Sequence, residues 1–145
     1  MELKLNDFVN KGGILVGTFL TAYVNETNLC HLGGFPAKSM RKLFGIWNEG
    51  MDYLFSDESI DVKDTNPDPE LALNGNCSTV VEQINLEGAS SLAEADSDFH
   101  KGFPIITKNK SNKGYAYYLG AQFEDNILVN FYKTLKQNHN LNDSN

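Results

Sequence analysis

The sequence predicts an α/β domain. A helical apolar pattern near the N-terminus leads straight into a buried strand, a hairpin signal occupies the second half, and an amphipathic helix follows it. A helix that feeds directly into a buried strand is typical of α/β layering. The 145 residues are 41% hydrophobic, which supplies enough apolar surface for one core. We expect one domain over residues 1–137 and a disordered tail over 138–145.

The first two elements are set by a change in the apolar period. Leu5, Phe8 and Val9 fall at positions i, i+3 and i+4, which places them on one helical face. The Gly12-Gly13 pair then tolerates positive φ and ends the helix. The run from Ile14 to Leu20 is β-branched and apolar, so it predicts a strand that is buried on both faces.

A second helix is expected after a sharp turn. The segment Gly33-Gly34-Phe35-Pro36 can bend the backbone, and Pro36 suits the first turn of a helix because its missing N–H costs nothing there. Leu43 and Phe44 contribute to the apolar face of this helix, and Gly45 closes it.

The middle of the chain mixes strands with a long polar stretch. Residues 46–55 predict a strand with a weak point at Gly50. Residues 56–77 are rich in Asp, Pro and Asn, which predicts a surface loop. Residues 80–86 are strand-like. The segment 89–95 is ambiguous, because its alanines favour a helix while its place between two strands favours a short strand.

The last third carries the clearest signals. Residues 104–107 and 115–119 flank a loop over 109–114 that is dense in Asn, Ser, Lys and Gly, which predicts a β-hairpin. A final helix begins at about Asp125, a suitable N-cap, and ends near Gln137. Its expected buried side comprises Ile127, Leu128, Phe131 and Leu135.

Charge and composition exclude several classes of function. The net charge is −7 and the pI about 4.8, whereas nucleic-acid binding relies on Lys and Arg. The apolar runs are much shorter than the ~20 residues of a membrane helix, and a signal peptide pattern is missing. Cys30 and Cys77 fit neither a CxxC metal pattern nor a disulfide scaffold. We therefore expect a cytoplasmic protein with reduced thiols, without nucleic-acid or membrane partners.

Candidate catalytic residues do not assemble into a site by sequence. A glycosidase needs two carboxyl groups about the scissile bond, but Glu49 and Asp52 would point to opposite faces of a strand. Most acidic residues crowd the loop at 56–77, where a solvated surface explains them. Cys30-His31 suggests a nucleophile with its base, yet adjacent residues of an extended chain point apart.

Cofactor and metal sites are not predicted either. His100 and His139 are isolated, and zinc needs three or four ligands. The glycine pairs form neither a GxGxxG nor a Walker loop. A basic and aromatic stretch superficially resembles a nucleic-acid surface, but a hairpin with a soluble tip and a half-buried strand explains it better. This stretch comprises Lys101, Lys108, Lys110, Lys113, Tyr115, Tyr117 and Tyr118.

A series of short segments between about Leu5 and Leu135 carries a resemblance to a known family. The segments are FVNKGG at 8–13, NETN at 25–28, HLGGFP at 31–36, LFGIW at 43–47 followed by Glu49, LEGA at 86–89, DF at 98–99, GFP at 102–104, NKSNKG at 109–114 and YY at 117–118. In order and spacing they resemble the middle domain of family 42 glycoside hydrolases, which are β-galactosidases.

The resemblance implies a fold and a role. Members of the family have a catalytic (β/α)₈ barrel that carries both catalytic glutamates, an α/β middle domain that builds the trimer, and a small β domain. The middle domain is a three-layer sheet of the class I glutamine amidotransferase-like (flavodoxin-like) type. The resemblance implies that this sheet is truncated here at its N-terminal part, which would leave an edge for another copy to cover.

The resemblance assigns structural positions and no catalytic ones. Catalytic, cofactor-binding and metal-binding residues are all expected to be absent. The structural positions of the motifs are Gly12, Gly13, Gly33, Gly34, Pro36, Gly45, Trp47 and Gly114.

Three hypotheses follow from these observations. The first is an oligomerisation module of a β-galactosidase, inactive alone, which forms a trimer or another homo-oligomer and has a β-galactosidase barrel as a further candidate partner. The second is a small amidotransferase-like hydrolase that uses Cys30. The third is a free-standing module that binds a sugar or a protein through the region from Gly33 to Trp47.

Overall fold

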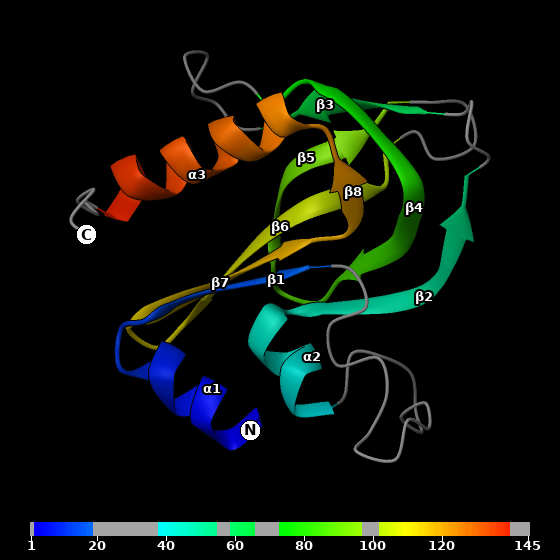
Figure 1. Cartoon of the computed structure of the whole chain (residues 1–145). Helices are drawn as coiled ribbons and strands as arrows, with labels where there is room; N and C mark the ends of the chain where they lie inside the picture. The colour runs from blue at the N-terminus through cyan, green and yellow to red at the C-terminus, as the bar shows by residue number, and fades with distance from the viewer. Residues whose placement is uncertain (1, 19–37, 55–58, 66–72, 97–101, 140–145) are drawn as a thin grey trace.

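The computed structural model describes residues 2–18, 38–54, 59–65, 73–96 and 102–139 (Figure 1). Several predicted features lie outside these described residues. They are Cys30, His31, Gly33, Gly34, Pro36, His100 and Lys101. The hypotheses that depend on Cys30 or on the turn at 33–36 therefore stay predictions.

The described chain contains three helices and eight strands. In chain order they are α1 (Glu2–Asn10), β1 (Ile14–Thr18), α2 (Lys38–Phe44), β2 (Ile46–Tyr53), β3 (Ile60–Asp64), β4 (Gly75–Leu86), β5 (Ser90–Ala95), β6 (Pro104–Ser111), β7 (Gly114–Leu119), β8 (Ala121–Phe123) and α3 (Asp125–His139). The predicted first helix, second helix, hairpin and last helix are confirmed. The ambiguous segment 89–95 contains a strand.

All strands belong to one mixed sheet that curls strongly. Its order is β1-β7-β6-β5-β3-β4-β2, and β8 pairs with β4. The only parallel pairing among the described strands is β1 with β7. Strand β8 follows β7 directly after Gly120 and pairs with β4. The sheet therefore curls so far that β4 lies beside the segment that continues β7. There the N–H of Glu82 donates to the carbonyl of Gly120 at 2.8 Å.

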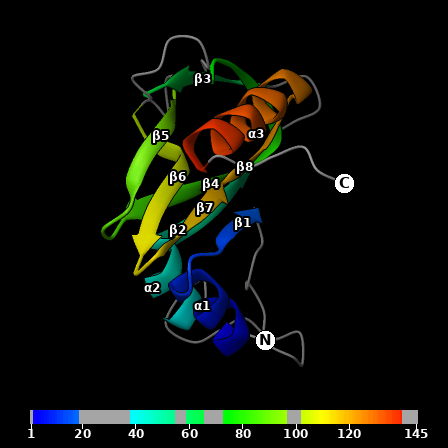
Figure 2. The same cartoon turned by 90° about the vertical axis from the view of Figure 1, so that its left-hand side faces the viewer.

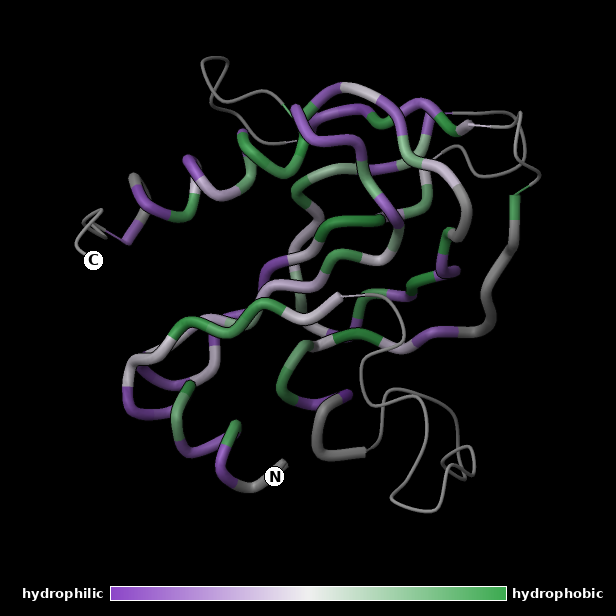
Figure 3. The backbone as a smooth tube through the Cα atoms, in the orientation of Figure 1, coloured by the Kyte–Doolittle hydropathy of each residue, from purple (hydrophilic) through white to green (hydrophobic). Residues whose placement is uncertain are grey.

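Helices cover both faces of the sheet, which gives three layers (Figures 1 and 2). Strand β7 contributes to both sides of the sheet, because successive side chains of a strand point to opposite faces. Tyr117 packs with Ile127 and Phe131 of α3, whereas Tyr118 packs with Phe44 of α2. Figure 3 shows the matching hydrophobic stretches along the strands. Strand β7 is therefore buried on both faces, and the expectation of a half-buried strand was wrong.

Strand β1 is present as predicted, but the expectation that it is buried on both faces was wrong. Ile14 and Val16 pack on the α3 side and Leu15 packs on the α1–α2 side. These three side chains stay partly exposed, since β1 lies at the end of the strand order and pairs with β7 alone in the described part of the sheet.

The acidic stretch at 56–77 was wrongly predicted to be one loop. It contains β3, and β4 begins within it at Gly75. Ile60 and Val62 are 4% exposed while Asp61 between them faces solvent, so the strand alternation is present. It spans only five residues and is surrounded by turn-forming residues, which is why composition concealed it.

Two further boundaries differ from the prediction. The loop of the β6–β7 hairpin is only Asn112-Lys113, with Ser111 paired to Gly114 and Asn112 at a φ of 52°. Asn is one of the few residues besides Gly that tolerate this conformation. Helix α3 continues to His139, two residues past the predicted end at Gln137; residues 140–145 lie outside the described part.

Gly114 allows the N-terminal helix to touch the hairpin. A Cβ atom there would lie 2.0 Å from the carbonyl oxygen of Val9 and 2.3 Å from that of Gly13. We predict that Gly114→Ala lowers the free energy of unfolding by about 1–3 kcal/mol or more, because backbone atoms must move. Chemical denaturation checks this, with Lys113→Ala at the exposed turn as the control. Equal stability of both variants would contradict the assigned role.

Candidate functional site

One carboxyl group is buried within the described part of the chain, that of Glu82 in β4. Its residue is 0% exposed. The hydroxyl of Tyr118 in β7 lies 2.7 and 2.8 Å from its two oxygens and donates to the carboxylate. The side-chain amide of Asn48 in β2 also donates to it. Three strands thus converge on one buried carboxyl group.

This buried centre is suited to holding strands together. Burying a carboxylate is costly unless hydrogen bonds compensate, and removing one partner of such a group is strongly destabilising. Asn48 is itself 2% exposed. A ligand cannot approach a carboxyl group that is closed off in this way, so the role of Glu82 in this centre is structural.

The motif glycines that the structure describes are turning points of the backbone. Gly12 has a φ of 110° and Gly45 a φ of 66°, which L side chains rarely adopt. The carbonyl of Gly45 accepts the N–H of Glu87 at 2.6 Å. At Gly13 an added Cβ would meet the ring of Phe8 at 2.5 Å. At these positions the backbone turns from the ends of α1 and α2 into the strands β1 and β2.

Trp47 belongs to a small cluster at the end of α2. The guanidinium of Arg41 lies 5.3 Å from its ring centroid and forms a two-point ion pair with Glu87. This pairing lowers the pKa of Glu87 and raises that of Arg41. Because both side chains are partly exposed, the pair contributes little stability. Its role is to join α2 to the turn after β4.

The described cysteine is not a nucleophile. Cys77 is a free thiol that is 1% exposed. Burial, and then the negative charge of Asp61, raise its pKa to about 12. Since the thiolate is the reactive form, this thiol is unreactive at neutral pH. The side chains of Glu49 and Asp52 lie outside the described ones, although both residues belong to β2 as predicted.

Part of the basic and aromatic stretch lies in the core, and part of it packs against the C-terminal end of α3. Tyr117 and Tyr118 are buried and cannot stack on a base. The hydroxyl of Tyr117 lies 2.6 Å from Nε2 of His139, and the His139 ring packs on Tyr115 at 4.7 Å. The ammonium of Lys108 lies over Tyr115 at 4.8 Å. These contacts anchor the C-terminal end of α3.

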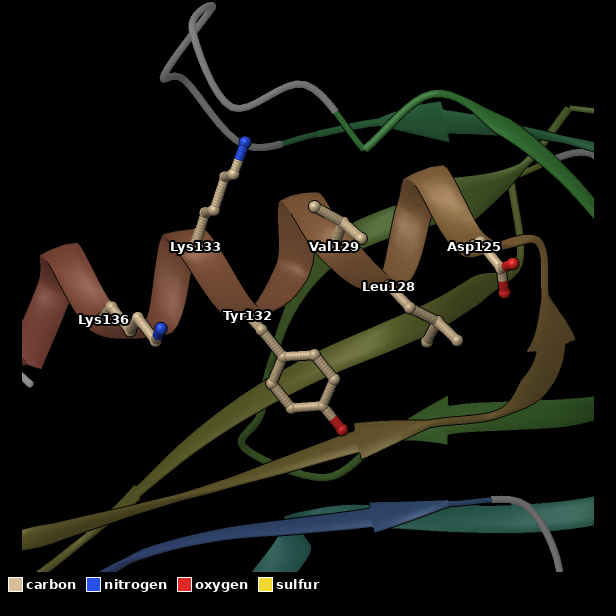
Figure 4. Close-up of a pocket in the computed structure, with 6 residues that line it drawn as sticks. All are labelled: Asp125, Leu128, Val129, Tyr132, Lys133 and Lys136. Atoms are coloured by element: carbon tan, nitrogen blue, oxygen red, sulfur yellow. The ribbon is translucent and has the colours of Figure 1, made fainter. Parts of the chain in front are cut away.

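Helix α3 also has an apolar side that the described chain leaves uncovered. Val129 is 51% and Tyr132 is 46% exposed. Together with Leu128 they line a shallow groove of about 490 Å³ (Figure 4). Asp125 lies at its N-terminal end, and Lys133 and Lys136 lie toward its C-terminal end. Leu128 is only partly buried, whereas the other three residues of the predicted buried side are buried as expected.

Two classes of site are not found in the described residues. The described residues contain no cluster of three or more His, Cys, Asp or Glu side chains that could hold a metal ion. None of their helices is long and apolar enough to span a membrane.

The chain matches a family model described as "Beta-galactosidase trimerisation domain" over residues 1–142. It is 36% identical over 132 residues to β-galactosidase BgaP of Planococcus sp. strain L4, covering 91% of this chain and 19% of that protein. It is 37% identical over 134 residues to β-galactosidase Pbg of Clostridium perfringens, with the same two coverages. The chain therefore spans about a fifth of these relatives.

Solved structures give the same similarity. The cold-adapted β-galactosidase from Rahnella sp. R3 superposes with a TM-score of 0.90 at 35% identity, over 97% of this chain and 21% of that one. The β-galactosidase from Bacillus circulans sp. alkalophilus superposes with a TM-score of 0.91 at 30% identity and the same coverages.

The buried centre generates a stability prediction. Tyr118→Phe removes the hydroxyl that donates to Glu82 and should lower the free energy of unfolding by about 1–3 kcal/mol, the cost of an unsatisfied buried group. Lys113→Ala at the exposed hairpin turn is the control and should change it by less than about 0.5 kcal/mol. Urea denaturation measures both. A Tyr118→Phe protein as stable as the control would contradict the structural role of the centre.

The anchor of α3 generates a pH prediction. Burial, and then the charge of Lys108, lower the pKa of His139 below its ordinary value of 6.5. The unfolded chain therefore takes up this proton at a higher pH than the folded one, so stability that is complete above about 6.5 is lost as the pH falls through the folded pKa.

His139→Gln should flatten this dependence. We expect thermal unfolding between roughly pH 8 and pH 5 to show a steeper loss on acidification for the natural sequence than for the variant. The same slope in both proteins would mean that His139 does not couple protonation to the packing of α3.

Proposed function

The chain belongs to the β-galactosidase trimerisation domain family, and from this premise we propose that it is the oligomerisation module of a β-galactosidase, without hydrolytic activity of its own. The observation that carries the proposal is the family match over residues 1–142. On this proposal, hydrolysis of terminal β-galactosides is the activity of a longer enzyme. The chain spans about a fifth of the length of the β-galactosidases that it matches.

The described site supports an inactive module. Glycoside hydrolysis needs two carboxyl groups on either side of a bound sugar. The most deeply buried carboxylate, Glu82, is instead held by Tyr118 and Asn48. It is 0% exposed, so a sugar cannot reach it.

Two partners follow from the proposal. The first is a second and third copy of the same chain, in a homotrimer. Support comes from the position of β1 at the end of the described sheet, because an edge strand invites pairing or cover. The second partner is the catalytic barrel of a β-galactosidase. A cytoplasmic location agrees with the free thiol of Cys77.

We also propose that the architecture is of the class I glutamine amidotransferase-like type. Helices lie on both faces of the sheet, and β1 runs parallel to β7. Parallel strands covered by helices on both faces are typical of α/β folds.

The test is an assay of the purified chain with a chromogenic β-galactoside beside its mass by light scattering. We expect no turnover and a mass of about three times 16.2 kDa. A monomer at all concentrations would contradict the oligomerisation role. Turnover that survives repeated purification would contradict the proposal that the module is inactive.

A further inference from the structure

Helix α3 presents a cationic and aromatic surface although the whole chain is acidic. Val129 and Tyr132 are the two most exposed large apolar side chains of this helix. Lys133 and Lys136 lie beside them on the same groove (Figure 4). We call Leu128, Val129, Tyr132, Lys133 and Lys136 the α3 face; Asp125 borders it at the N-terminal end of the helix, and the two lysines outnumber it. Exposed apolar surface bordered by charge is typical of a protein interface.

A second surface has the opposite character. Phe103, just before β6, is 40% exposed, and Asp61 of β3 and Asp96 after β5 are both exposed. Backbone hydrogen bonds hold them together, from Asp96 N–H to the carbonyl of Asp61 at 2.8 Å and from Ala95 N–H to that of Phe103 at 2.9 Å. We call Asp61, Asp96 and Phe103 the acidic corner.

The two surfaces lie in different parts of the molecule. The acidic corner lies at the end of β5 and the start of β6, whereas the C-terminal end of α3 lies over the β6–β7 hairpin, where His139 contacts Tyr115 and Tyr117 (Figure 1). One copy therefore cannot cover its own α3 face with its own corner. Two distinct and complementary surfaces are what a closed ring of three copies requires, because each copy meets its two neighbours through different patches.

Charge selects the occupant of the α3 face. With a net charge of −7, two copies that approach at random repel each other. The pair of lysines on α3 offers an attractive contact for Asp61 and Asp96 of another copy. The aromatic groups, Tyr132 on one side and Phe103 on the other, supply apolar area that charges alone would not, and such residues often dominate binding energy.

We propose that the α3 face of one copy docks on the acidic corner of the next, and that three such contacts close the trimer. This inference rests on the proposed oligomerisation function. It adds the two surfaces and the head-to-tail arrangement.

Charge reversal tests the pairing. The variants Lys133→Glu/Lys136→Glu and Asp61→Lys/Asp96→Lys should each raise the concentration at which the trimer dissociates by at least about tenfold, since like charges then meet. The chain that carries all four substitutions should recover the trimer. The control is Lys110→Glu/Lys113→Glu at the exposed hairpin tip, which changes the net charge as much as the α3 variant.

Light scattering during dilution measures these changes, and far-UV circular dichroism confirms that each variant is folded. Because substitution of Asp61 beside buried Cys77 could disturb folding, Tyr132→Ala serves as a second variant on the exposed α3 face and should also weaken the trimer. A trimer that resists both the α3 reversal and Tyr132→Ala would overturn this pairing but leave the proposed function intact. Equal weakening by the hairpin-tip control would also overturn it. A natural chain that is monomeric would defeat the proposed function itself.

Discussion

The two-sided burial of β7 is the constraint on which the rest of the structure depends. Tyr117 on one face packs against α3, and Tyr118 on the other face packs against α2. Each hydroxyl needs a partner when it is buried. The first finds His139 at the end of α3, and the second finds Glu82 in β4. Both helical layers and the curled edge of the sheet are thus tied to one strand.

This arrangement holds the interior of the fold firmly and leaves one side of α3 exposed for contact with another molecule. The buried centre around Glu82 fixes β2, β4 and β7 together, and the groups it needs are supplied from inside the fold. The outer side of α3 keeps Val129 and Tyr132 exposed on a well-anchored helix. A rigid support lowers the entropy cost of association, which is consistent with an oligomerisation role.

Local signals predicted much of the fold but little of the site. The helix ending before Gly12, the hairpin and the helix beginning at Asp125 follow from glycine, turn and capping chemistry. Strand β3 was missed because two buried residues, Ile60 and Val62, are too few to outweigh the turn formers around them. Glu82 was missed although an acidic residue within an apolar strand is a signal; its partners Asn48 and Tyr118 are 34 and 36 residues away.

The sequence by itself determined the α/β class, the β-hairpin and the helix that follows it, and the resemblance to family 42 β-galactosidases. It could do so because periodicity, capping and motif spacing are written within a few neighbouring residues. Only the tertiary structure decided that β8 returns to β4, that Glu82 is enclosed, and that one side of α3 stays uncovered. Those features depend on which distant residues meet when the sheet curls.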